Sequence, residues 1–170
     1  GIYAKRKLTE RAGLSIGLNF SSYSTQQLTG AYVDNVSSLT TSYYRSGSSA
    51  NFINKYYYLQ LPISFHWQLN KSKKLSVVFQ NGLSVGLLAG SDALVYSPSF
   101  NGFYKDRKSF NKLQLSYQTG LYTKLFNQSQ KPVTVGFLFN YHLSRLQKVD
   151  SYGGNHLSSF GIQLGWLLKK

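Results

Sequence analysis

The chain has 170 residues, which suits a single domain, and 19 Lys and Arg against 5 Asp and Glu, for a formal net charge of +14. It has no cysteine, which excludes disulfides, thiolate catalysis and cysteine metal sites. No run approaches the roughly 18 consecutive apolar residues of a transmembrane helix, which excludes a helical membrane protein. The abundance of Tyr, Phe, Ser and Gly predicts an all-β chain with loops.

The first third of the chain predicts two strands and a long loop. Residues 1–8 form a short candidate strand that ends in a turn at 9–11. Over 14–23, apolar side chains alternate with Ser, Gly and Asn, and this period of two indicates a strand with two unlike faces. Residues 25–54 are rich in Ser, Thr, Asn and Gly, which predicts a long loop.

The most regular stretch is 56–69, YYYLQLPISFHWQL. Its odd positions are all apolar or aromatic, and its even positions are mostly polar and never charged. An ordinary globular strand has about 5–6 residues, so this predicted strand is unusually long. A short turn at 70–74 and another alternating strand at 75–89 follow.

The second half of the chain repeats this plan. It predicts, in order, a long loop at 90–111, a strand at 113–123, a short turn at 127–131, a strand at 133–143, a long loop at 145–155 and a strand at 157–168. Short and long connections alternate, so an up-and-down sheet places all short turns at one end and all long loops at the other. Outer-membrane barrels show this asymmetry.

The alternation does not by itself say which face meets solvent. A lipocalin-like soluble barrel would turn the apolar row inward, but soluble surfaces carry roughly 25–35% charged residues. Here the six strands at 14–23, 56–69, 75–89, 113–123, 133–143 and 157–168 contain no Asp, Glu, Lys or Arg, and four aspartates fall in the long loops: Asp34, Asp92, Asp106 and Asp150. We therefore predict one domain over 1–170, an antiparallel up-and-down transmembrane β-barrel with its apolar face in lipid and its polar face inside.

Parity within the strands divides the side chains between the two faces. Aromatic residues at both ends of the outer face predict interfacial girdles, although the same residues also suit the core of a β-sandwich: Tyr56, Tyr57, Phe65, Trp67 and Trp166. Polar side chains of the other parity are predicted to fill the lumen: Gln60, Ser64, His66, Gln80, Gln114, Gln118, Asn140, His142 and Gln163.

Seven strands are visible, whereas single-chain bacterial barrels have an even number. Either the first strand precedes residue 1 or the loop at 25–54 hides one. The first option keeps every short turn on the same side, so we expect an eight-stranded barrel with its first strand upstream.

Four short motifs resemble the PorT-like, or "porin family", outer-membrane β-barrel domains of Bacteroidota. They are Gly1-Ile2-Tyr3-Ala4 with Leu8-Thr9-Glu10-Arg11, Gly17-Leu18-Asn19-Phe20, Tyr58-Leu59-Gln60-Leu61-Pro62-Ile63, and Asn81-Gly82-Leu83. The resemblance implies an eight-stranded barrel in the bacterial outer membrane. Two departures are the missing first strand and a terminus ending Lys169-Lys170 where bacterial barrels commonly end on an aromatic residue. The family has no single shared activity, and the secretion-associated PorT proteins are one branch.

Signals for chemistry are few. The five carboxylates show no acid/base pairing, and the three histidines show no metal-ligand spacing, so we predict no catalytic residue, metal or cofactor. His66 and His142 share the inward parity and could meet inside the barrel. A Ser–His pair for lipid deacylation stays open, because sequence does not reveal proximity.

The loop at 90–111 combines basic and aromatic residues, which we predict to contact lipopolysaccharide phosphates or a partner: Phe103, Tyr104, Lys105, Arg107, Lys108 and, just beyond, Lys112. A solvated loop charge explains them equally well. Uncharged strands argue against a nucleic-acid surface, so we expect no nucleic-acid partner.

We therefore expect a structural or interaction protein that acts through its long loops. Its partners would be outer-membrane lipid, lipopolysaccharide and other proteins of an envelope assembly, for which secretion is one setting. A lipid-modifying enzyme and a narrow pore are the alternatives.

Overall fold

The computed structural model describes residues 1–34, 42–70, 72, 75–125, 132–148 and 156–166. Within these ranges the protein is built from strands, with one three-residue 3₁₀ turn, η1 (Pro98–Phe100). The described residues contain no helix long and apolar enough to cross a membrane.

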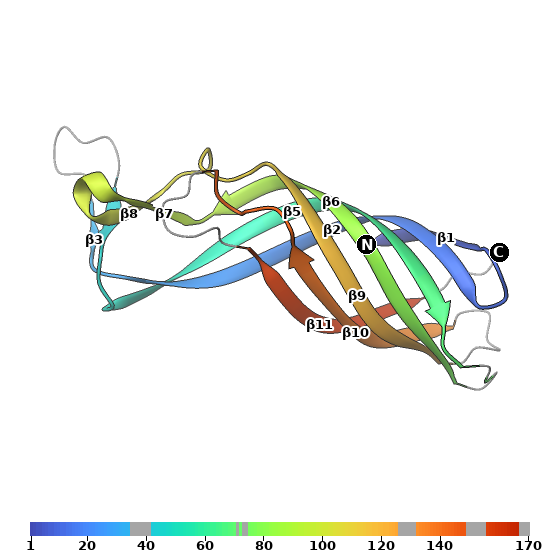
Figure 1. Ribbon diagram of the computed structural model, residues 1–170. Coiled ribbons are helices and arrows are strands. Elements are labelled where there is room, and N and C mark those ends of the chain that lie inside the picture. The colour runs from blue at the N-terminus through green and yellow to red at the C-terminus, as the bar shows by residue number, and fades with distance from the viewer. Residues whose placement is uncertain (35–41, 71, 73–74, 126–131, 149–155, 167–170) are drawn as a thin grey trace.

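The main sheet has seven antiparallel strands in the order β1-β2-β5-β6-β9-β10-β11 (Figure 1). These are β1 (Ile2–Lys7), β2 (Ala12–Thr29), β5 (Ala50–Gln68), β6 (Ser76–Asp92), β9 (Leu113–Leu125), β10 (Val133–His142) and β11 (Ser158–Trp166). Each strand pairs with the next strand of the sheet along the chain, which confirms the predicted antiparallel, up-and-down order. In the described residues β1 and β11 each have one neighbour, so the sheet is open.

The sheet is nevertheless strongly curled. Contacts across its inner face between strands that are not neighbours show this curl. The Lys5 amine on β1 donates to the Tyr122 hydroxyl on β9 at 2.6 Å. Tyr23 on β2 and His142 on β10 bring their rings to 4.9 Å between centroids. These contacts define one face as concave.

The pattern of burial on this sheet is the reverse of the pattern in a soluble protein. The concave face buries polar side chains, among them Ser15, Gln60, Ser64, Gln80, Ser84, Gln114, Ser116 and Gln118. The convex face leaves bulky apolar side chains about half exposed, for example Ile16 at 52%, Leu61 at 53%, Leu83 at 50% and Phe137 at 55%. In the isolated chain, the main sheet therefore does not follow the rule that apolar residues lie inside.

Two predicted long loops are wrong in extent, because much of each is strand. β2 and β5 remain paired from the middle of the sheet out to Thr29 and Ala50. The rest contributes a second sheet in the order β3-β4-β8-β7, made of β3 (Tyr32–Val33), β4 (Tyr43–Arg45), β7 (Leu94–Ser97) and β8 (Gly102–Lys105). It lies at the end of the molecule opposite the short turns (Figure 1). Asp92, predicted in a loop, is the last residue of β6.

The outer part of β2, from Ser24 to Thr29, is mostly polar on both faces and therefore shows no period-two pattern. The strands of the small sheet have two to four residues each, which is too short for such a pattern. Of the third predicted loop, 145–148 is described and pairs Gln147 with Phe110 in an isolated bridge; residues 149–155 lie outside the described part of the chain.

An apolar core forms where the two sheets meet. Its buried members are Tyr56, Tyr58, Ala93, Val95, Phe110, Leu146 and Leu157. The small sheet is thus anchored to the main sheet as an ordinary water-soluble fold would be, although the main sheet is not packed in that way.

The short turns are held by side chains. The Thr9 hydroxyl oxygen accepts hydrogen bonds from the Arg11 and Ala12 amides at 3.3 and 2.9 Å. Asn70 accepts from the Val77 amide at 2.9 Å and donates to the Leu75 carbonyl at 2.6 Å. Both explain why the chain can reverse here within a few residues. The predicted turn at 127–131 lies outside the described residues.

A β-bulge interrupts the ladder between β5 and β6. Tyr57 pairs with Gly90 and Tyr58 pairs with Leu88, which leaves Ala89 as the extra residue. One inserted residue reverses the alternation of the strand that carries it. The buried parity on β6 therefore changes from even to odd, and Ser91 becomes buried.

Candidate functional site

A hollow at the loop end is lined by residues from two strand ends. Ser91, Asp92 and Ala93 come from the end of β6 and the residue after it, while Lys105, Asp106 and Arg107 come from the end of β8 and the following turn. The two segments meet because β7 and β8, which lie between them in the chain, pair as a hairpin that sets Leu94 opposite Lys105.

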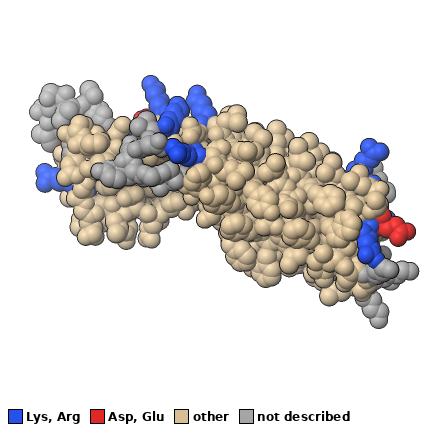
Figure 2. All heavy atoms as spheres, in the orientation of Figure 1, with Lys and Arg blue, Asp and Glu red and all other residues tan. Residues whose placement is uncertain are grey.

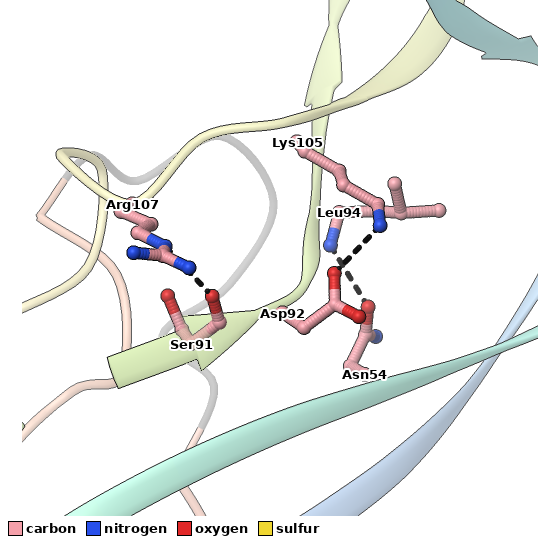
Figure 3. Close-up of polar contacts among 6 residues, drawn as sticks. All are labelled: Asn54, Ser91, Asp92, Leu94, Lys105 and Arg107. Atoms are coloured by element: carbon pink, nitrogen blue, oxygen red, sulfur yellow. Dashed lines mark hydrogen bonds and ion pairs between the residues drawn. The ribbon is translucent and has the colours of Figure 1, made fainter. Parts of the chain in front are cut away.

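Polar contacts fix the walls of this hollow (Figure 3). The Lys105 amine lies 2.8 Å from a carboxylate oxygen of Asp92, and Arg107 donates from Nε to the Ser91 carbonyl at 3.1 Å. Asn54 on β5 accepts from the Leu94 amide at 2.8 Å, which ties β7 to the main sheet. The Lys105 and Asp92 side chains are 57% and 49% exposed, so their ion pair adds at most about 1 kcal/mol.

Asp106 organises the turn that carries Arg107. One carboxylate oxygen accepts from the Lys108 amide at 2.8 Å, and the other accepts from the Ser109 hydroxyl at 2.6 Å. The Ser109 hydroxyl bond, followed by the Lys108 amide bond, lowers the pKa of Asp106 below its ordinary value. The ionised carboxylate therefore holds the turn.

The six residues predicted as a loop cluster separate into three groups. Lys105 and Arg107 line the hollow, while Lys108 and Lys112 are exposed and do not line it. Phe103 packs on Tyr96 at 5.3 Å between ring centroids, and Tyr104 packs against the apolar core. Ser91, Asp92, Ala93 and Asp106 complete the lining of the hollow and were not singled out as site residues from the sequence. Asp106 with Ser109 three residues later was the one local signal for the turn.

All nine residues predicted for the lumen lie on the concave face. Seven are buried, and Asn140 and Gln163 are half-buried. Gln80 and Gln118 both donate to the Ser64 hydroxyl, which links three strands across the interior. Gln114 donates to the Arg145 carbonyl at 2.9 Å at the loop end.

The two interior histidines have different partners. His66 Nε2 lies 2.6 Å from the Ser15 hydroxyl, and its Nδ1 lies 3.1 Å from the Tyr122 hydroxyl. His142 packs edge-on against Tyr23 and Tyr58, and neither of its ring nitrogens has a hydrogen-bond partner among the described residues. The expectation that the two histidines could meet thus finds no contact between them.

The Ser15–His66 pair has the proximity that a deacylase needs. Tyr122 stands where a carboxylate would orient the imidazole, and Lys5 donates to that same hydroxyl. Ser15 is only 5% exposed, so this conformation does not present its hydroxyl to a substrate. No group of three His, Cys, Asp or Glu suited to a metal ion occurs in the described part of the chain.

Four of the five predicted girdle aromatics lie on the convex face. Phe65, Trp67 and Trp166 are 39%, 43% and 75% exposed, and Tyr57 stacks on Phe20 at 6.2 Å between centroids. Tyr56 was predicted wrongly, because it is 3% exposed and belongs to the apolar core. It shares the even parity of Gln60 and Ser64, so the alternation of β5 turns it inward.

No family model matches the chain, and no curated protein or solved structure matches it significantly.

The contrast between the histidines gives a stability test. His66→Phe leaves the Ser15 and Tyr122 hydroxyls without their shared partner, and we expect it to lower the free energy of unfolding by about 1–3 kcal/mol. His142→Phe keeps the ring packing and removes two unpaired nitrogens, so we expect no loss. Equilibrium unfolding in urea measures both changes in stability. Equal losses would contradict the hydrogen-bond arrangement.

The Asp106 turn gives a pH test. The lowered pKa means that the turn gains stability from the carboxylate above the ordinary Asp pKa of about 3.9, and loses it as the pH falls through the folded-state pKa. We expect Ser109→Ala to raise the pKa of Asp106 toward the ordinary value. An NMR titration of the Asp106 carboxyl measures the change, with Ser99→Ala as a control outside the turn. An unchanged Asp106 titration in Ser109→Ala would refute the assigned cause.

Proposed function

We propose that this protein is an eight-stranded-type β-barrel of the bacterial outer membrane, with a structural or interaction role at its loop end. One observation carries the proposal: the concave face is polar and buried while the convex face is apolar and exposed. Lipid hydrocarbon is the surrounding that makes such a surface favourable.

The distribution of charge supports a membrane belt. Figure 2 shows Lys and Arg gathered toward the two ends of the molecule, with a broad middle zone free of charged side chains on this face. On β5 the exposed row runs from Leu59 to Trp67. Its length fits the roughly 9–11 tilted residues with which a strand crosses the hydrocarbon.

The open edges support closure by one further strand. Since every neighbouring pair is antiparallel, β1 and β11 run in the same direction. A single strand antiparallel to both would complete an even-numbered barrel and satisfy both edges, which hydrocarbon requires. The resemblance of the sequence motifs to PorT-like domains agrees with this count.

The interaction role is supported by the loop end. There the chain forms a second sheet that an apolar core joins to the main sheet, with a charged hollow beside it, which is a platform of the kind that recognition uses. We propose that it contacts lipopolysaccharide and other envelope proteins, as an accessory subunit of an envelope assembly with secretion as one setting.

The alternatives have weaker support. Gln and Ser side chains that bond across the interior, together with His and Tyr rings, occupy the space that a pore would need. A lipid-modifying activity is favoured by the 2.6 Å contact between Ser15 and His66, but the serine is buried.

Matched arginine substitutions test the membrane belt. Leu61 and Leu28 are 53% and 56% exposed, but Leu61 lies in the middle of the belt and Leu28 lies near the loop end of β2. We expect Leu61→Arg to lower the free energy of unfolding in bilayers by about 2–4 kcal/mol, because a midplane charge is costly. Leu28→Arg should cost less than about 1 kcal/mol. If Leu61→Arg is as harmless as Leu28→Arg, the belt is not in hydrocarbon.

Three measurements separate the roles. The interaction role predicts a specific partner that co-purifies in mild detergent, no conductance in planar bilayers, and an unchanged mass of lipid A when the protein is expressed. Steady conductance would instead indicate a pore. A lipid A mass change that Ser15→Ala abolishes would indicate the enzyme.

A further inference from the structure

One hydrogen bond orients the exposed Arg107 side chain at the hollow. Its Nε donates to the Ser91 carbonyl at 3.1 Å, which leaves both terminal NH₂ groups of the guanidinium without a hydrogen-bond partner among the described residues. Figure 3 shows the guanidinium group facing the two oxygens of Ser91. A guanidinium fixed at Nε presents its remaining donors as a fork, the geometry that suits two oxygens of one oxyanion.

The Ser91 hydroxyl is a second unused donor in the same wall. Ser91 is 5% exposed like Ser15, but it lines the hollow, and its Oγ has no hydrogen-bond partner in the described part of the chain, whereas the Ser15 hydroxyl is already paired with His66. Buried polar groups are nearly always paired, so an orphaned hydroxyl beside an oriented guanidinium points to a ligand oxygen. The bulge at Ala89 places it there by reversing the parity of β6.

The nearby carboxylates are already engaged. Asp92 pairs with Lys105, and both oxygens of Asp106 accept hydrogen bonds from its own turn. Lys108 and Lys112 are exposed close by in sequence. Of the lining groups, Arg107 is therefore the cation whose charge is not matched by an ion pair in the described structure.

The level of the hollow matches the lipid headgroups of the proposed membrane. Tyr57, which stacks on Phe20 on the convex face, pairs with Gly90. Ser91 and Asp92 are the next two residues of β6, about 3–7 Å farther along the strand. Headgroups begin just beyond the hydrocarbon boundary at which such aromatics gather.

We propose that the hollow binds a phosphoryl group through the Arg107 fork and the Ser91 hydroxyl, and that the phosphate belongs to the lipid A part of lipopolysaccharide. The choice of a lipid as the source of the phosphoryl group rests on the proposed outer-membrane function. The inference that the site binds a phosphoryl group does not rest on that function.

The test is isothermal titration calorimetry on the full chain in detergent micelles. It measures the affinity for diphosphoryl lipid A and for dephosphorylated lipid A. We expect Arg107→Gln to weaken binding of diphosphoryl lipid A at least tenfold, with Arg107→Lys intermediate and Ser91→Ala several-fold weaker than wild type. Lys148→Gln removes the same charge from an exposed position outside the hollow and should change binding less than twofold. Arg107→Gln should leave the binding of dephosphorylated lipid A unchanged.

Equal weakening by Arg107→Gln and Lys148→Gln would overturn the site, because it would show only diffuse attraction. Equal binding of the two lipids by the wild type would overturn it too, as would absence of binding. Inorganic phosphate separates the sources: displacement of lipid A by millimolar phosphate shows that the phosphoryl group alone suffices, and failure to displace it shows that the lipid-borne group is required. If Leu61→Arg proved harmless while phosphate still bound through Arg107, the membrane proposal would fail and this site would stand.

Discussion

Backbone hydrogen bonding between neighbouring strands is the interaction on which this structure depends. Along most of the main sheet the side chains supply no apolar interior, because the bulky ones point outward and stay about half exposed. The continuous ladder from β1 to β11 therefore holds the sheet together, and each strand between these two edge strands is hydrogen-bonded on both sides. Such a ladder is strongest where water does not compete for its donors and acceptors.

The same constraint explains the interior. Curling the sheet brings polar side chains of distant strands together, and they satisfy one another, as Ser64 does with Gln80 and Gln118. Lys5 extends this network to the edge strand by its bond to Tyr122. Small residues of the inner row, such as Ser15 and Ser64, leave room for the larger Gln, His and Tyr side chains that cross the interior.

The loop end follows ordinary rules for proteins in water. Its core around Tyr58 and Phe110 is apolar, and its charges are exposed at the rim. The change from an exposed apolar face to a buried apolar core occurs near the bulge in β6. There the inward parity shifts and Ser91 enters the wall of the hollow. The position of the hollow is therefore a consequence of where the apolar belt ends.

The strands of the main sheet could be read from the sequence because side chains alternate at each position along a strand, as between Leu59 and Trp67, and this local pattern needs no partner. The sequence also determined, by leaving long stretches such as 14–23 and 56–69 uncharged, that their apolar face is a poor match for water. Only the tertiary structure decided the rest. The pairing of β2 with β5 out to Thr29, the joining of β4 to β8, the inward turn of Ser91 and the contact of Ser15 with His66 all depend on partners far away in the chain, and no local periodicity encodes a partner.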